Sequence, residues 1–292
     1  MKILITGGSG FIGRNIIEHF QSEHQILAPT HAELELMDDE AVSAYLENNP
    51  VDIVIHAAVR PGHRNAKNPS HELYHNTRMF FNLARNSKHF KKMIYLGSGL
   101  GYDLRHYLPK MKEDYLGTHI PDDEGGFSKY LISKYIEKAD NIVELRIFGI
   151  FGKYEDYAIR FISNMICKAI FDLPLTMKQN RRFDYIYIDD LMPAIEYFLN
   201  NQGAYKAYNI TPDSSIELLQ LAEKVKNVSG RNLPIKIGQS GLGPEYSGDN
   251  TRLRSEIKEL RFTPIDDAIS KLYEWYKLNK NKIDRQSILV DK

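Results

Sequence analysis

The chain has 292 residues, enough for one large domain or two smaller ones with a sizeable core. Lysine plus arginine and aspartate plus glutamate are equal at 38 each, so no basic surplus points to nucleic acid as a partner. A single cysteine, Cys167, in an apolar stretch, excludes an internal disulfide and fits a reducing compartment. With no signal peptide before the first strand and no membrane-spanning apolar run, we expect a cytoplasmic protein.

The first predicted elements are a buried strand at residues 3–6, a glycine-rich turn and an amphipathic helix over residues 14–20. Gly7 permits the tight turn, Gly10 lets the backbone approach a pyrophosphate, and Gly13 lets the helix pack close to the strand. The pyrophosphate would lie on free N–H groups at the start of the helix. The residues predicted to bind a dinucleotide here are Gly7, Ser9, Gly10, Phe11, Ile12, Gly13 and Arg14.

Strand and helix signals then alternate through the first half of the chain. This alternation predicts an α/β fold of the Rossmann type, a doubly wound parallel sheet with helices on both faces. In such a sheet ligands bind at the carboxyl ends of the strands, so chemistry is expected just after each strand. The predicted strands cover residues 25–28, 51–56, 92–96 and 142–148, and the predicted helices cover residues 38–47, 72–87 and 130–140.

After residue 152 the pattern loosens. We interpret residues 1–152 as the dinucleotide-binding domain, and residues 153–292 mainly as a smaller substrate-binding cap, with some segments rejoining the sheet. The polar tail after Asn279 suggests no role. The predicted elements of this half are helices at 158–171, near 189, 215–228 and 265–278, strands at 184–188 and 205–210, and a turn-rich loop at 244–249.

Three side chains suggest hydride and proton chemistry. Ser98 follows the fourth strand, where its hydroxyl can hydrogen-bond a substrate oxygen. Tyr130 and Lys134 stand four residues apart, which places a phenol and an ammonium on one helical face. A tyrosine has a pKa of about 10, and a nearby positive charge brings that pKa toward a useful range for proton transfer.

These motifs resemble the extended short-chain dehydrogenases/reductases, in the group of nucleotide-sugar epimerases, dehydratases and reductases. The resemblance covers nearly the whole chain, and its last segment resembles the GDP-fucose synthases. Besides the glycines and Tyr130 to Lys134, the matching segments are His56-Ala57-Ala58, 76–83, Leu96-Gly97-Ser98 with Tyr102, 146–152, 183–191, 208–210 and 249–253.

The resemblance implies a role for each motif residue. Tyr130 is implied as the catalytic acid/base, Lys134 as its electrostatic partner and ribose ligand, and Ser98 as the hydroxyl that orients the substrate. Ala57 and Ala58 are implied to line the nicotinamide ribose and phosphate path. Asp38 is implied to hold the adenine edge, and it also stands where a helix N-cap is expected. Pairing of two copies through the helices around 76–87 and 130–140 is common in the family, so a homodimer is expected.

The second strand bears on the choice of cofactor. NAD binding in this fold usually places an acid near the end of that strand, on the ribose hydroxyls. Residues 27–31 read Leu-Ala-Pro-Thr-His, with no acid before Glu33. Thr30, His31 and Arg14 could instead receive a 2′-phosphate, so NADP is favoured over NAD.

The residues after Ser98 narrow the reaction. Family dehydratases need an Asp-Glu pair there, and this chain has Gly99-Leu100-Gly101. Fucose synthases also need a cysteine after the serine and a histidine after the fifth strand, and neither is present. The sequence therefore favours reduction of a 4-keto nucleotide sugar. The alternatives are a C4 epimerase with tightly bound NAD and a non-catalytic NADP-binding scaffold; Ser98, Tyr130 and Lys134 argue against the scaffold.

Candidates for the substrate site are less specific. The family's asparagine after the fifth strand is Gly149 here, and the arginine before the paired aspartates is Phe183. The guanidinium group of arginine matches phosphate oxygens in geometry and charge. For each candidate, however, the sequence supports a solvated surface side chain as well as it supports phosphate binding. No metal site is expected, because His71 and His75 have no third ligand in the motif. The candidates for the nucleotide diphosphate are Arg182 and Arg252, with Arg64 and Lys67 as weaker ones.

Overall fold

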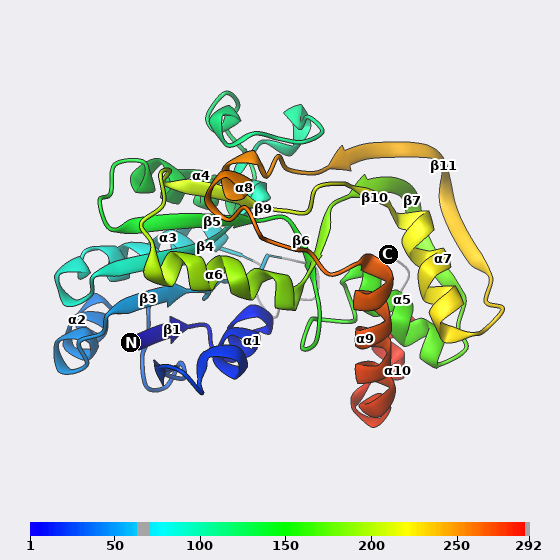
Figure 1. Cartoon of the computed structure of the whole chain (residues 1–292), viewed down its shortest axis with the longest axis horizontal. Coiled ribbons are helices and arrows are strands. Elements are labelled where there is room, and N and C mark those ends of the chain that lie inside the picture. The colour runs from blue at the N-terminus through cyan, green and yellow to red at the C-terminus, as the bar shows by residue number, and fades with distance from the viewer. Residues whose placement is uncertain (63–69, 290–292) are drawn as a thin grey trace.

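A six-stranded parallel sheet forms the centre of the molecule (Figure 1). The computed structural model describes residues 1–62 and 70–289. The strands lie in the order β2-β1-β3-β4-β5-β9, so the winding reverses between β1 and β3, and the predicted Rossmann-type α/β fold is confirmed. The strand bounds are β1 Lys2–Thr6, β2 Gln25–Leu27, β3 Ile53–His56, β4 Lys92–Ser98, β5 Ile142–Ile147 and β9 Ala207–Ile210.

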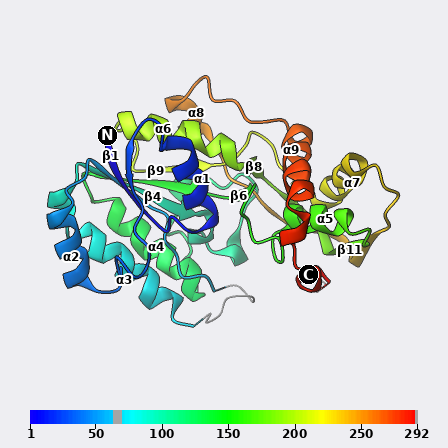
Figure 2. The ribbon, with the colours of Figure 1, turned by 90° about the horizontal axis from the view of Figure 1, so that it is seen from below.

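Helices cover both faces of this sheet, as Figure 2 shows. Successive side chains of a strand point to opposite faces. Ile3 and Ile5 of β1 belong to the buried cluster that includes α1 and α6, whereas Leu4 belongs to the cluster under α2, α3 and α4. The helix bounds are α1 Phe11–Phe20, α2 Asp39–Asn48, α3 Glu72–Ala84, α4 Glu124–Ile136 and α6 Leu191–Asn200.

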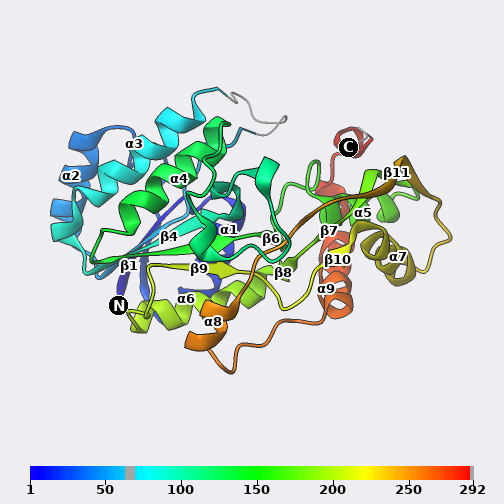
Figure 3. The same cartoon turned by 90° about the horizontal axis from the view of Figure 1, so that it is seen from above.

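The second part of the chain forms a smaller unit beside the carboxyl ends of the sheet (Figure 3). Strand β7 pairs with β11 in parallel and with β10 antiparallel, and β6 pairs with β8. Among the residues that the structure describes, no helix is long and apolar enough to cross a membrane. The bounds are β6 Gly149–Phe151, α5 Phe161–Ile170, β7 Leu175–Phe183, β8 Tyr185–Tyr187, β10 Ile216–Glu217, α7 Leu218–Ser229, β11 Ile235–Tyr246, α8 Thr251–Glu256, α9 Ile265–Leu278 and α10 Arg285–Ile288.

Strand β9 and helix α6 return from the second half of the chain to the central sheet. Strand β9 pairs in parallel with β5, from Glu144 opposite Ala207 to Ile147 opposite Ile210. Segments after residue 152 thus complete the first sheet, and the division into domains at that residue stays an interpretation.

Helix α4 runs from Glu124 to Ile136, so the predicted stretch 130–140 begins inside it, and the last four residues of that stretch lie beyond the end of the helix. The carboxylate of Asp123 caps it by accepting the backbone N–H of Gly126 at 2.7 Å. Packing favours glycine at position 126, since a Cβ there would lie 2.8 Å from the carbonyl oxygen of Leu100.

Candidate active site

The glycine turn after β1 is built by close backbone contacts. Gly7 has a φ of +74°, and a Cβ on it would lie 2.7 Å from the backbone nitrogen of Ala58. A Cβ on Gly13 would lie 2.2 Å from the carbonyl oxygen of Gly7. Gly10 is the N-cap of α1 and provides no side-chain cap. The start of α1 thus has no side-chain cap and lies where the winding of the sheet reverses, between β1 and β3. Its free backbone N–H groups form a cradle that fits a pyrophosphate.

Strand β3 ends beside this turn. The Nδ1 atom of His56 lies 2.7 Å from the Thr6 hydroxyl, which ties the ends of β3 and β1 together. Burial lowers the pKa of His56 to about 3, so its imidazole is neutral and can serve only as a hydrogen-bonding group. Ala57 and Ala58 follow with small, half-buried side chains. Their position beside Gly7 agrees with the predicted path of the cofactor.

The residues predicted to select NADP already have partners within the chain. The backbone N–H and hydroxyl of Thr30 donate to the Glu33 carboxylate at 2.7 and 2.9 Å. His31 lies 3.1 Å from the Glu35 carboxylate. The Arg14 guanidinium lies 4.5 Å from the centre of the Tyr154 ring. The structure therefore places a carboxylate beside Thr30, and the choice between NADP and NAD stays a prediction.

Asp38 has the capping role that its position suggests. Its carboxylate is the N-cap of α2 and accepts the backbone N–H groups of Glu40 and Ala41 at 3.0 and 3.1 Å. The second predicted role, on the adenine edge, stays a prediction.

The structure does not bring Lys134 to the strand ends. Its ammonium pairs with Glu137, and both side chains are more than a third exposed. Tyr130 stacks on Phe127 with ring centroids 6.3 Å apart. A Cβ on Gly117 would lie 3.8 Å from the Tyr130 hydroxyl, so that phenol borders the loop before α4. The catalytic roles of Tyr130 and Lys134 stay predictions, and this geometry supplies no contact between them and Ser98.

A second lysine of α4, Lys129, points toward the sheet instead. Its ammonium donates to the hydroxyl of Tyr95 on β4 at 2.9 Å. Burial lowers the pKa of Lys129 to about 8, although the carboxylates of Glu144 and Glu72 oppose this shift. The sequence carried a signal for this lysine, because Ser128-Lys129 repeats the Ser-Lys pair at 133–134.

Ser98 ends β4 and meets a residue from the smaller unit. Its hydroxyl accepts the backbone N–H of Leu100 at 3.2 Å, and the next residue, Gly99, contacts Tyr246, the last residue of β11. A Cβ on Gly99 would lie 2.5 Å from the Tyr246 hydroxyl. The site therefore has no room for a side chain directly after Ser98. Sequence reasoning missed Tyr246, which appeared only as part of a turn-rich loop.

Aromatic rings surround this pair of hydroxyls. The Tyr246 ring lies 4.9 Å from Tyr107, 5.2 Å from Phe148 and 5.7 Å from Phe183, centroid to centroid. The Tyr107 hydroxyl is buried and has no partner among the described residues. Phe183, where the family resemblance led us to expect an arginine, thus packs against Tyr246 and extends the apolar wall.

A polar network supports the ends of β4, β5 and β9. Arg146 donates to Glu144 at 3.0 Å and to the Tyr102 hydroxyl at 2.9 Å, and all three side chains are buried. Tyr102 in turn donates to Asn209 at 2.9 Å. The Ser133 hydroxyl donates to Glu144 at 2.8 Å, so the second Ser-Lys pair contributes its serine to this network.

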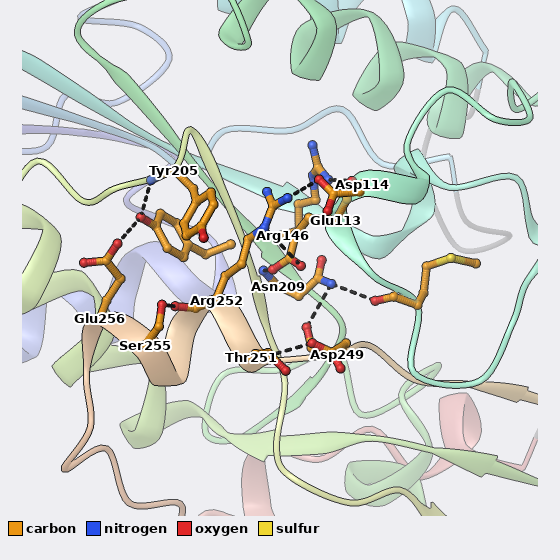
Figure 4. A network of polar contacts seen from close by, with 12 residues as sticks. Glu113, Asp114, Arg146, Tyr205, Asn209, Asp249, Thr251, Arg252, Ser255 and Glu256 are labelled. Atoms are coloured by element: carbon orange, nitrogen blue, oxygen red, sulfur yellow. Dashed lines mark hydrogen bonds and ion pairs between the residues drawn. The ribbon is translucent and has the colours of Figure 1, made fainter.

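The predicted substrate arginines lie apart and are partnered. Arg182 lies 3.2 Å from Glu217. Arg252 of α8 forms an ion pair with Asp114, and its guanidinium lies 3.8 Å from the Glu113 carboxylate. The same guanidinium lies 4.4 Å from the centre of the Tyr205 ring, and Figure 4 shows these neighbours around Arg252. The structure does not bring these two arginines together. Arg64 and Lys67 lie outside the described residues.

Comparisons with known proteins identify the family. Residues 3–211 match the model of the NAD dependent epimerase/dehydratase family. The chain belongs to this family. The predicted extended short-chain dehydrogenase/reductase type and the predicted NAD(P)-dependent oxidoreductase are therefore confirmed.

Relatives within the family cover the chain almost completely. GDP-L-colitose synthase of Yersinia pseudotuberculosis is 25% identical over 96% of this chain and 99% of its own length. The dTDP-4-dehydro-6-deoxyglucose reductase of Escherichia coli is 27% identical over 92% and 96%. The NADP-bound GDP-mannoheptose C4 reductase of Campylobacter jejuni has the same fold, with a TM-score of 0.83, 22% identity and coverage of 94% and 98%.

Asp184, next to the aromatic wall, makes stability depend on pH. Burial raises the pKa of Asp184 to about 7, while Thr211 and the backbone of Gly248 donate to its carboxylate. Between pH 4 and pH 7 the folded state therefore holds a proton that the unfolded state has released, so stability falls as pH rises through this window. We expect the free energy of unfolding of the natural protein to fall from pH 5 to pH 8, measured in urea. The side chain in Asp184→Asn cannot titrate, so its free energy of unfolding should fall less over this pH range. Equal falls in the two proteins would contradict the raised pKa of Asp184 as the cause.

Proposed function

We propose that this protein reduces a 4-keto nucleotide sugar with NADPH, adding hydride at C4. The observation that carries the proposal is the position of Ser98 at the carboxyl end of β4, two strands from the glycine turn after β1 and beside the aromatic wall. A hydroxyl there can orient a carbonyl oxygen, and aromatic rings can pack on a sugar. The relatives whose names describe reductases and synthases of nucleotide sugars support the same reaction class.

The residues present fit a dinucleotide, because Gly7 and Gly13 pack closely against backbone and α1 begins at Gly10 without a side-chain cap. Gly7, Gly10, Gly13 and the start of α1 would hold its pyrophosphate, with Ala57 and Ala58 beside it. When bound, the nicotinamide supplies the hydride. Ser98 orients the carbonyl oxygen by hydrogen bonding. A phenol supplies the proton, and the family resemblance predicts Tyr130 for that role.

The surroundings of Ser98 support reduction over dehydration. A 4,6-dehydratase needs an acidic pair just after the hydroxyl, and a side chain at Gly99 would meet Tyr246 and Phe148 at 2.5 and 2.9 Å. Reversible oxidation in a C4 epimerase needs the same residues as a reductase, so the two reactions are separated by assay.

The test measures loss of nicotinamide absorbance with purified protein, NADPH or NADH, and a panel of 4-keto nucleotide sugars made in situ. The panel includes dTDP-4-dehydro-6-deoxyglucose and GDP-linked 4-keto-6-deoxyhexoses. We expect NADPH oxidation with one member, and a loss of about 10²-fold or more in Ser98→Ala, because an orienting donor at a reacting oxygen contributes on that scale. Interconversion of 4-hydroxy sugars without added cofactor would contradict reduction and favour the epimerase.

We also propose that two copies pair through α3 and α4 and that the protein is cytoplasmic. Tyr74 and Tyr135 expose 61% and 41% of their surfaces on these helices, and the Tyr135 ring packs 5.2 Å from Phe81. Exposed aromatic side chains are enriched at protein interfaces. Light scattering is expected to give twice the mass of the chain for the natural protein and the monomer mass for Tyr135→Glu; a monomer in both would contradict the pairing.

A further inference from the structure

Helix α4 carries two Ser-Lys pairs, at residues 128–129 and 133–134. Five residues turn an α-helix by about 140°, so the two lysines cannot share a face. The structure separates them. Lys129 reaches Tyr95 on β4, and Lys134 pairs with Glu137 in solvent. Only the first lysine points toward the sheet.

The surroundings of Lys129 place it at the cofactor edge. The positive charge of Lys129 contributes to the lowered pKa of His56, the last residue of β3. The His56 ring lies 5.7 Å from the ring of Tyr95 on β4. His56 is followed directly by Ala57 and Ala58, beside the glycine turn. An ammonium at this position can reach the hydroxyls of a ribose bound along β3.

The residue four positions before Lys129, on the same face of the helix, is Gly125. A Cβ there would lie 3.3 Å from a carboxylate oxygen of Glu72. The tyrosine-x-x-x-lysine spacing therefore has glycine at its tyrosine position when the inward lysine is used. Helix α4 presents no phenol one turn before Lys129.

A phenol reaches Ser98 from another element. Tyr246 ends β11, and its hydroxyl lies 2.5 Å from the position of a Cβ on Gly99, the residue directly after Ser98. A phenol is protonated at neutral pH, the form that a proton donor to a ketone requires. Gly99 leaves the space that the Tyr246 hydroxyl occupies.

We propose that Lys129 is the lysine of the cofactor site and that Tyr246, near Ser98, donates the proton in the reduction. This assignment rests on the proposed function. As the carbonyl carbon takes its hydride, the O–H bond of Tyr246 breaks and the proton moves to the carbonyl oxygen, directly or through the Ser98 hydroxyl. The phenolate then takes a proton from water. The sum is ketone, NADPH and one proton giving alcohol and NADP⁺.

The first experiment titrates NADPH binding by fluorescence and needs no sugar substrate. We expect Lys129→Met to weaken NADPH binding about tenfold to a hundredfold, because a charged hydrogen bond is lost. Lys138→Met, just beyond the end of the same helix, is the matched control and should bind as the natural protein does. Weakened binding in Lys134→Met together with unchanged binding in Lys129→Met would overturn the assignment of the lysine.

The second experiment compares tyrosine variants with the panel member that the natural protein reduces. Tyr246→Phe should lower kcat about 10²-fold or more while NADPH binding is kept, the scale of a lost general acid. Tyr45→Phe is the matched control, since it removes a phenol hydroxyl on α2, outside the aromatic wall. Thermal unfolding of each variant checks that the fold is retained.

The outcomes separate this inference from the proposed function. If the natural protein reduces a panel member and Tyr130→Phe stops turnover while Tyr246→Phe does not, the reductase stands and the role of Tyr246 is overturned. If the natural protein reduces no member, the proposed function and the role of Tyr246 both fall. The binding titration still decides the place of Lys129 in that case.

Discussion

Gly13→Ala is expected to weaken NADPH binding about tenfold to a hundredfold, because overpacking at a fixed backbone costs about 1–3 kcal/mol. The added methyl would lie 2.2 Å from the carbonyl oxygen of Gly7 and 2.9 Å from the Cα atom of Gly8. Neither neighbour is the flexible end of a side chain, so α1 must move away from β1. That movement displaces the helix start that would hold the pyrophosphate. Fluorescence titration with NADPH measures the loss.

Gly101→Ala is the matched control for this variant. A Cβ at Gly101 would meet Leu116 and Lys129 at 3.6 Å, an ordinary contact. We expect its NADPH affinity to equal that of the natural protein. Equal affinity in Gly13→Ala would contradict the placement of the cofactor on this turn.

Glu144→Leu is expected to lower the free energy of unfolding by about 3–5 kcal/mol, because it leaves the buried guanidinium of Arg146 without its carboxylate partner. The side chains of Glu144 and Arg146 are only 1% and 3% exposed and lie 3.0 Å apart. Glu144 also accepts the Ser133 hydroxyl and opposes the lowered pKa of Lys129. Urea unfolding gives the change in stability.

The double variant Glu144→Leu with Arg146→Met removes both charges and tests the cause. Replacing a whole buried ion pair by apolar side chains is often close to neutral. We therefore expect the double variant to be more stable than Glu144→Leu alone. A double variant less stable than the single one would show that packing, and not the uncompensated charge of Arg146, dominates the loss.

The sequence predicts the central sheet well because short apolar strands recur between helices and end in recognisable residues. The glycine turn was also accessible, since Gly7, Gly10 and Gly13 stand between a strand and a helix. Ser98 was found for the same reason, as the polar side chain at the end of β4.

Which lysine of α4 faces the sheet could not be predicted in the same way. Both Ser128-Lys129 and Ser133-Lys134 fit a helix, and only burial against β4 distinguishes the two lysines. Glycines at 125 and 126 also hid the first turn of the helix, whose start depends on the Asp123 cap. Tyr246 was hidden because its approach to Gly99, next to Ser98, joins residues about half the chain apart and follows from strand pairing in the smaller unit.

The late return of β9 to the edge of β5 has a consequence for synthesis of the chain. Residues 1–152 leave the ribosome before residues 207–210 exist, and at about 5–20 residues per second the interval lasts several seconds. During that time the backbone N–H and C=O groups along the free edge of β5 have no strand partner, and such an edge can template pairing with another nascent chain. Slower translation between residues 152 and 207 is therefore expected to lengthen the exposure of this edge.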